Sequence, residues 1–299
     1  MTNIVKNQHY VPRFYLNYFV NEIGRIFVYD KFTLTSFAAN PTGIASEGYF
    51  YDIIKGKYQV IETVLNAKFE IPFSNFLPIF IGKLEHHQHF KVKKFEKEAI
   101  AAFLSYQYIR TKRFREESVR LFDDSNIYLS EAHFPPQLGH IFVLSDPKIQ
   151  EGIYNNLLNN YYWIFGRNQT DKLFYTSDHP LVQKETLQSI HNKNSDSSFA
   201  DFTLLDEELS FPITPKYNIT FYKKNKMWKH LKRFDGRRVD VNDTNVEWYN
   251  GLQILRSYRQ IYSSDNDFSF IEIVEERRRK QLIEEGVPAD TIRVPTQRN

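Results

Sequence analysis

The hydrophobic pattern of this chain changes near its middle, and that change limits the folds open to it. Before about residue 165, apolar residues recur at helical spacing, most clearly over 93–123, where one stripe consists of Ile100, Phe103, Leu104 and Tyr108. Beyond about residue 173, short aromatic and β-branched runs separated by proline and polar segments are typical of strands. The sequence therefore predicts an α+β fold, with a helical first half packed on a small, mainly antiparallel sheet contributed largely by the second half.

Turn residues and prolines place the remaining elements. Helices are expected at 12–19, 60–85, 93–123, 148–165, 243–257 and 269–286. Strands are expected at 25–30, 48–52, 173–177, 209–214, 219–223 and 259–263. Pro72 and Pro78 should divide the second helix into two or three pieces, and Gly166 should end the fourth. A polar loop is expected at 188–201. With no internal repeat or linker, we expect one α+β domain over 1–287 and a flexible tail at 288–299.

The absence of cysteine from all 299 residues excludes disulfides, thiolate zinc sites and cysteine nucleophiles. It fits a reducing cytoplasm, which is the expected location. No apolar run approaches the roughly 18 residues that span a bilayer, so no membrane partner is expected. Composition gives no indication of the oligomeric state.

The segment Lys6 to Phe19 carries the densest group of candidate functional side chains. His9 and Arg13 flank the start of a short helix, where the imidazole could act as an acid or base and the guanidinium could clamp a phosphate. Gln8 and Tyr10 stand beside them as candidate substrate-binding residues. The alternative is a histidine and an arginine that only brace the N-terminus against a carboxylate.

Polar residues also interrupt two helical stripes. Gln107 and Arg110 border an apolar face, so both need partners if buried. Arg110 could bridge to Glu62 or Glu70, or face the same cavity as His9. Glu62 and Glu70 share one helical face and could hold a divalent metal ion, although such a pair is more often a solvated stripe. The sequence does not identify a cofactor beyond this.

Ser177, Asp178 and His179 follow directly after a predicted strand. A strand end is a common place for catalytic side chains, and Asp178 could be a general base or a metal ligand. The alternative is an Asx turn before Pro180, which needs no chemistry. The histidine-rich run 86–89 is typical of a solvated helix end.

One stretch dominates the charge distribution. Lys223 to Arg238 holds eight cations against the single anion Asp235, whereas the whole chain carries a net charge of +3. Aromatic residues alternate with these cations, as expected where a protein neutralises a nucleic-acid backbone. The candidate substrate-binding residues here are Lys224, Trp228, Lys229, Lys232 and Arg233. The alternative is a charged hairpin at the surface.

Four segments together resemble a bacterial family called domain of unknown function 4238. They are the run Gln8 to Phe19, the run Gln107 to Thr111, the run Thr176 to Pro180 and the run Phe211 to Thr214. The resemblance covers most of the chain and implies that these segments form one site. The family tends to carry Arg where this chain has Asn17, so a phosphate-binding role is not transferred to that position.

These observations lead to one functional hypothesis and two alternatives. We expect a phosphodiester-directed hydrolase, specifically a nuclease in a bacterial defence or toxin setting, with His9, Arg13, Gln107, Arg110 and Asp178 in its catalytic site and a metal ion assisting. One alternative is an enzyme of nucleotide consumption or ADP-ribosyl or nucleotidyl transfer, with Tyr10 and Tyr15 stacking on the base. The other is a module that binds nucleic acid or a phosphorylated ligand without chemistry. No standard phosphate loop, serine-hydrolase elbow or zinc-protease motif is present.

Overall fold

A computed structural model of the chain describes residues 4–52, 54, 59–124, 136–186, 189–190, 203 and 205–286. Its helices are α1 Arg13–Leu16, α2 Val60–Leu65, α3 Ile71–His86, α4 Lys94–Ile109, α5 Lys112–Asp124, α6 Pro136–Ser145, α7 Pro147–Asn160, α9 Asp243–Arg256 and α10 Ser269–Glu284. Short 3-10 helices cover Asn17–Phe19, Pro41–Gly43 and Lys229–Phe234, the last labelled η4. None of these described helices is long and apolar enough to cross a membrane.

The strands form two sheets and a two-stranded ribbon. They are β1 Asn7–His9, β2 Ile26–Asp30, β3 Thr35–Ala39, β4 Ser46–Gly48, β5 Tyr161–Asn168, β6 Thr176–Ser177, β7 Val182–Gln183, β8 Glu208–Thr214, β9 Tyr217–Lys223, β10 Arg237–Val241 and β11 Gln260–Ser263. The five-stranded sheet has the order β10-β5-β9-β8-β7, the four-stranded sheet β3-β2-β11-β6, and the ribbon β1-β4. Only the β10–β5 pair is parallel among the described pairs. The predicted α+β class is therefore confirmed.

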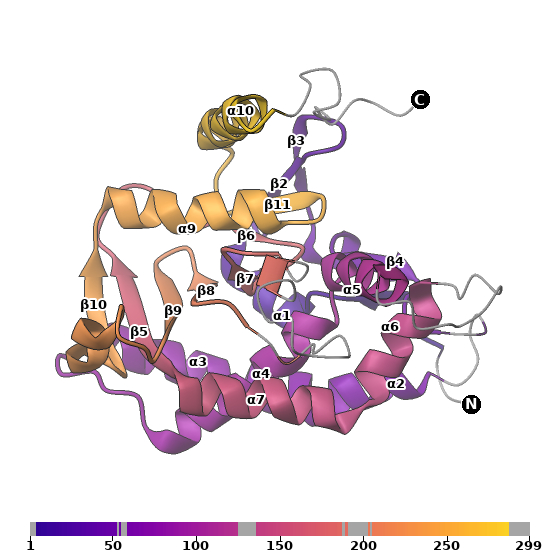
Figure 1. Cartoon of the computed structure of the whole chain (residues 1–299), viewed down its shortest axis with the longest axis horizontal. Helices are drawn as coiled ribbons and strands as arrows, with labels where there is room; N and C mark the ends of the chain where they lie inside the picture. Colours follow the sequence, from indigo (N-terminus) through magenta and orange to yellow (C-terminus); the bar gives the residue numbers. More distant parts are fainter. Residues whose placement is uncertain are drawn as a thin grey trace.

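Helices cover both faces of the five-stranded sheet. Successive side chains of β9 point to opposite faces and contact the helices on each side. Ile219 and Phe221 point into the main apolar core, which they share with α3, α4 and α7. Tyr222, on the opposite face, bonds to Tyr249 of α9 at 2.9 Å between the hydroxyl oxygens. Figure 1 shows α9 on one side of this sheet and α3, α4 and α7 on the other, with α10 beyond α9. The short helix α1 lies near the centre of this arrangement.

The predicted single helix over 93–123 is wrong, because α4 ends at Ile109 and α5 starts at Lys112. At the break, the Thr111 hydroxyl accepts a hydrogen bond from the Phe114 N–H at 3.3 Å, which caps α5. The same hydroxyl bonds to His179 Nδ1 at 2.7 Å. The apolar pattern in the sequence continues past this point, but the contacts of Thr111 end the helix here.

Replacing Thr111 with alanine should destabilise the protein by about 1–2 kcal/mol, because α5 loses a cap and a buried imidazole loses its partner. Thr111→Ser keeps the hydroxyl and should behave nearly as wild type. Urea unfolding measures the difference. If Thr111→Ala were as stable as wild type, the capping role would be ruled out.

The helical stretch expected over 60–85 is divided into three pieces, as predicted, but Pro78 is not at a boundary. A π-helical segment, Asn66–Glu70, follows α2 directly and leads into α3 without a gap. The wider π turn places Pro72 in the first turn of α3, where its missing N–H is not needed. Pro78 lies inside α3 and does not end it.

Two other boundaries also differ from the prediction. The helix expected over 148–165 ends at Asn160, because the aromatic run that starts at Tyr161 forms β5. Gly166 is not a helix stop but lies within β5, where a Cβ would come within 3.1 Å of a methyl group of Val241. The strand expected over 48–52 is a turn after β4, and Tyr49 has a positive φ of 56°. The loop 188–201 is mostly, and the tail 288–299 wholly, outside the described residues.

Candidate functional site

Segments that are far apart in the sequence meet at the carboxyl end of α4. An Arg110 Nη2 hydrogen is donated to the His9 carbonyl at 2.5 Å, and Gln107 Nε2 donates to the neighbouring Tyr10 carbonyl at 3.0 Å. Thr111, next in the chain, holds His179. The N-terminal segment and the segment after β6 therefore approach α4 from two sides.

Arg110 is a buried hub of this arrangement. Its side chain is 2% exposed, and Nη1 lies 2.7 Å from the Glu70 carboxylate. Its Nε donates to the Tyr51 hydroxyl at 3.1 Å. Of the two partners that the sequence suggested for Arg110, Glu70 is the one it contacts. With three protein partners and almost no exposure, Arg110 positions its neighbours rather than receiving a ligand.

Two other candidates also face inward. Gln8 is fully buried, with Nε2 donating to Asp52 at 2.6 Å and Oε1 accepting from the Tyr51 N–H at 2.6 Å. The Tyr10 ring lies 5.1 Å from the Phe50 ring, and burial raises the pKa of its hydroxyl. Gln8 and Tyr10, the residues before and after His9, therefore anchor the backbone of this segment through their buried side chains.

Three side chains of this region carry a buried polar atom without a hydrogen-bond partner among the described residues. They are His9 with Nε2, Glu62 with Oε2 and Gln107 with Oε1. A buried polar atom without a partner costs about 1–3 kcal/mol, so a group of three such atoms indicates a place where a ligand or water completes the bonding.

The protonation of His9 is set by its surroundings. Burial lowers its pKa, and the charges of Arg13 and Arg110 lower it further. A hydrogen bond to the Pro41 backbone and the charge of Glu70 act in the opposite direction. The imidazole is therefore neutral at neutral pH and has a ring nitrogen ready to accept a proton.

The pKa of Glu62 is shifted in the opposite direction to that of His9. Burial raises the pKa of its carboxyl to about 7, Arg110 opposes this rise, and Glu70 and Asp52 add to it. The charges of Arg110 and Glu70 thus act on the pKa of both His9 and Glu62. A neutral imidazole and a carboxyl with a raised pKa are complementary groups of the kind that acid–base catalysis uses.

Arg13 supplies the accessible positive charge of the cluster. It begins α1, its side chain is exposed, and within the described part of the chain it makes no hydrogen bond or ion pair. The charge of Arg13 lowers the pKa of His9, so the guanidinium lies near the imidazole. A free guanidinium beside a neutral imidazole can bind an anionic group such as phosphate.

The suggested metal ligands Glu62 and Glu70 lie in this cluster, but Glu70 is engaged by Arg110. No group of three or more His, Cys, Asp or Glu side chains placed to hold a metal ion occurs among the residues that the structure describes. The protein groups placed for chemistry here are therefore His9, Glu62 and Arg13.

Asp178 and its neighbours form a separate, structural group. The Asp178 carboxylate accepts the backbone N–H groups of Tyr258, Arg259 and Gln260 at 2.7–2.8 Å, instead of forming an Asx turn. Burial raises its pKa, while these donors and Lys31 lower it. Its oxygens are thus occupied with holding the start of β11.

Ser177 and His179 are buried beside it. The Ser177 hydroxyl donates to Gln253 Oε1 at 2.7 Å, and the His179 ring lies 5.7 Å from that of Tyr108. Burial lowers the pKa of His179 to about 3.

His140 is a second buried neutral histidine. Its Nδ1 accepts a hydrogen bond from Arg115 Nε at 3.1 Å, so Nε2 carries the proton donated to the Ile109 carbonyl at 2.6 Å. Burial, followed by the charge of Arg115, lowers its pKa to about 3. Protonation would place a hydrogen on Nδ1 against the Arg115 donor.

Lowering the pH from 7 to 5 should cost about 2 kcal/mol of stability for each of His140 and His179. The unfolded chain takes up protons below its ordinary histidine pKa of 6.5, but the folded chain does so only near pH 3. This stability is complete above pH 6.5 and is lost as the pH falls toward 3. Urea midpoints at both pH values measure it. His179→Gln should weaken the dependence and the exposed control His86→Gln should not; equal midpoints for wild type would contradict the assignment.

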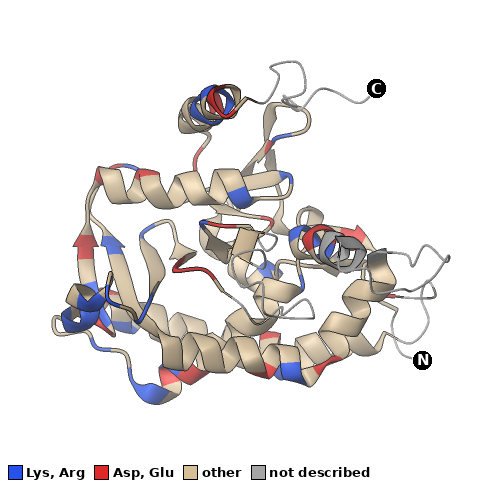
Figure 2. Cartoon of the chain, viewed as in Figure 1, with Lys and Arg blue, Asp and Glu red and all other residues tan. Residues whose placement is uncertain are grey.

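The basic stretch lies elsewhere on the molecule. Figure 2 shows Lys and Arg gathered where η4 and β10 lie, away from α1. Lys229, Lys232 and Arg233 are exposed on η4. Lys224 donates to the Asn159 carbonyl at 2.9 Å, and the half-buried Trp228 packs on Tyr222 with ring centroids 4.7 Å apart. These candidates do not join the His9 cluster.

Sequence reasoning missed two contributors to the site, because Tyr51 bonds to Arg110 and Asp52 bonds to Gln8. It named Glu62 only as a metal ligand, whereas the raised pKa of its carboxyl also makes it an acid–base candidate. A local signal was present for Tyr51 and Asp52, which end a strongly aromatic run. The role of Glu62 depends on burial, which the sequence alone does not show.

The family model described as protein of unknown function (DUF4238) matches residues 7–267, which include all four segments discussed above. No curated protein and no solved structure matches the chain.

Proposed function

The chain belongs to the DUF4238 family of proteins of unknown function, and we propose that it is a phosphodiester-directed hydrolase acting on nucleic acid. The observation that carries the proposal is the pair of titratable side chains, His9 and Glu62, each with a buried atom that lacks a partner among the described residues. Titratable side chains whose pKa values are shifted in opposite directions, one lowered and one raised, are typical of a catalytic site.

Each residue has a distinct role in this proposal. His9, neutral at pH 7, removes a proton from the attacking water, and Glu62 protonates the leaving oxygen. Arg13 binds the phosphate and stabilises the charge that develops on it. Arg110 and Gln107 are positioning residues, since they hold the backbone carbonyls of His9 and Tyr10.

Incubation of the full chain with end-labelled single-stranded and duplex DNA and RNA tests the proposal. Reactions with Mg²⁺ and with EDTA, resolved by gel and mass spectrometry, should yield shorter oligonucleotides in at least one case. Intact substrates under all conditions would overturn the hydrolase assignment. The setting in bacterial defence or toxicity stays a prediction from the sequence.

The alternative of nucleotide or ADP-ribosyl transfer has less support. Tyr10 and Tyr15, which were expected to stack on the base, lie in the core. The Tyr15 hydroxyl bonds to Thr176 at 2.7 Å and to the Pro212 carbonyl at 2.6 Å. Parallel reactions with NAD⁺ and ATP, read by mass spectrometry, distinguish this activity from strand cleavage.

A binding module is the second candidate, and the exposed cations of η4 favour it. Such a module would bind nucleic acid with a strong salt dependence but release no product. The same reactions, combined with a binding titration, separate the two functions.

A further inference from the structure

A pocket of about 580 Å³ lies at the end of α3, far along the chain from His9. The residues that line it are Ile79, Gly82, Lys83, His86, His87, His89, Phe90, Lys91 and Lys93. The wall contains three lysines and three histidines and no acidic side chain. Such a lining favours an anionic ligand.

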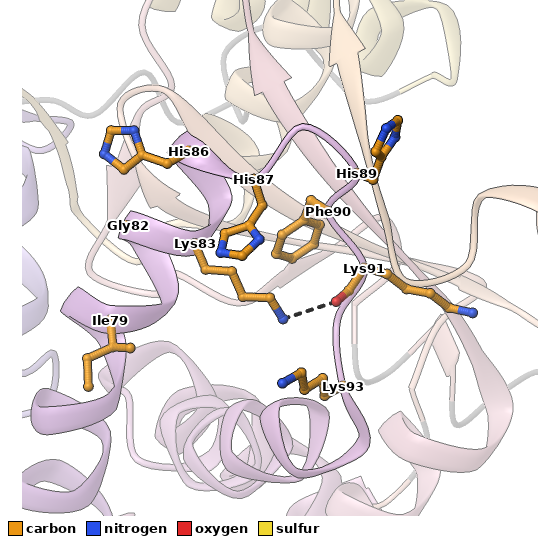
Figure 3. A pocket seen from close by; sticks show the side chains of 9 residues that line it. All are labelled: Ile79, Gly82, Lys83, His86, His87, His89, Phe90, Lys91 and Lys93. Atoms are coloured by element: carbon orange, nitrogen blue, oxygen red, sulfur yellow. Dashed lines mark hydrogen bonds between the residues drawn. The ribbon is translucent and has the colours of Figure 1, made fainter.

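The cations of the pocket differ in availability. Lys83 Nζ lies 2.7 Å from the buried Glu96 carboxylate and donates to the Lys91 carbonyl at 3.0 Å, so its charge is balanced. Lys93 is exposed; its backbone N–H donates to the Glu96 carboxylate at 2.6 Å, but its ammonium group has no carboxylate partner among the described residues. In the view of Figure 3 the Lys83 ammonium lies between the His87 ring and the Lys93 ammonium. Lys93 and His87 are therefore free to meet an incoming anion.

The pocket borders the basic stretch. The Val92 N–H donates to the Gly236 carbonyl at 2.8 Å, and Lys91 pairs with Arg237 in a β-bridge. On the loop 87–93, on η4 and on β10, the exposed cations that lack a carboxylate partner in the described part of the chain are Lys91, Lys93, Lys229, Lys232, Arg233 and Arg237. We call these six residues the basic face.

Few negative charges offset the basic face. Glu96 is held by Lys83, and Asp235 lies 2.9 Å from Lys97. Exposed Glu85 is the nearby acid left over, 3.9 Å from His86 Nε2. Of the basic face, Lys91 and Lys93 line the pocket, while the other four cations lie on the neighbouring η4 and β10.

We propose that this pocket and the basic face form an anchoring site for the phosphate backbone of nucleic acid, separate from the His9 cluster. This inference rests on the proposed function for the identity of the polymer. Glu70 precedes the first residue of α3, whereas His86 is the last, and a helix of 16 residues is about 24 Å long. That distance corresponds to about seven base pairs of duplex. The anchor therefore selects polymers long enough to reach from the pocket to the His9 cluster.

Fluorescence anisotropy with a 30-nucleotide labelled DNA, single-stranded and duplex, tests the anchor in a His9→Ala background that prevents cleavage. Lys91→Ala/Lys93→Ala/Arg237→Ala should weaken binding about tenfold or more at low salt. The slope of log affinity against log salt should fall in magnitude by about 2–3, because three phosphate contacts are lost. His87→Ala should weaken binding by a smaller factor at unchanged slope.

The control removes three exposed cations of α10, Arg277→Ala/Arg279→Ala/Lys280→Ala, and should leave both affinity and slope close to wild type. Unchanged binding by the triple variant of the basic face would overturn the anchor, as would the absence of salt-dependent binding by the His9→Ala protein. A wild-type chain that binds nucleic acid through these residues but cleaves none would support the anchor and overturn the proposed hydrolase function.

Discussion

Replacing Arg110 with alanine is expected to destabilise the protein by about 3–5 kcal/mol, the largest effect of any single change considered for the fold. The substitution leaves the half-buried Glu70 carboxylate without its partner and removes the donors to Tyr51 and to the His9 carbonyl. Losing one member of a buried ion pair costs more than the pair contributes, because the remaining charge stays poorly solvated. Urea unfolding at pH 7 measures the change.

Two variants sharpen this test. Arg110→Lys keeps the charge but not the forked donors, so it should recover only part of the loss. Arg167→Ala removes an arginine from the exposed pair with Asp240 and should cost about 1 kcal/mol or less. An Arg110→Ala protein as stable as the Arg167→Ala protein would show that the buried hub does not hold the site together.

Replacing His9 with alanine should lower the rate of strand cleavage about 10²–10⁴-fold, because the proposed general base is lost. Glu62→Gln preserves the shape of the side chain but removes the ionisable carboxyl, and it should lower the rate to a similar extent. His9→Ala removes the hydrogen bond of the ring to the Pro41 backbone, and Glu62→Gln removes no hydrogen bond between described side chains, so both proteins should stay folded. Initial rates on the substrate found by product analysis measure the effect.

The matched control is Glu98→Gln, which makes the same chemical change at a half-buried glutamate on the first turns of α4. Its cleavage rate should equal that of wild type. Full activity in a folded His9→Ala protein would remove the imidazole from the mechanism, and full activity in Glu62→Gln would remove the carboxyl.

The parts of the fold that sequence predicted well are those with strong local signals. The strand β2 and the helices α9 and α10 lie close to their expected positions. The partner of Arg110 was also among those anticipated, since a buried guanidinium near an apolar stripe needs a carboxylate.

The errors came from tertiary contacts that override local pattern. Thr111 ends α4 because its hydroxyl caps α5 and holds His179, a residue 68 positions away. Asp178 looked like a strand-end base, but it binds three backbone N–H groups near residue 259, which no local rule foresees. Burial of Glu62, which raises the pKa of its carboxyl to about 7, likewise depends on the packed structure.

The pH dependence of cleavage under single-turnover conditions tests the central claim most directly, namely that His9 and Glu62 act as base and acid. Because burial lowers the pKa of His9 and raises that of Glu62 to about 7, the wild-type rate should form a bell. Its acidic limb follows His9 and its alkaline limb falls near pH 7. In Glu62→Gln the alkaline limb should disappear along with most of the rate. An alkaline limb near pH 7 that persists unchanged in Glu62→Gln would contradict the account.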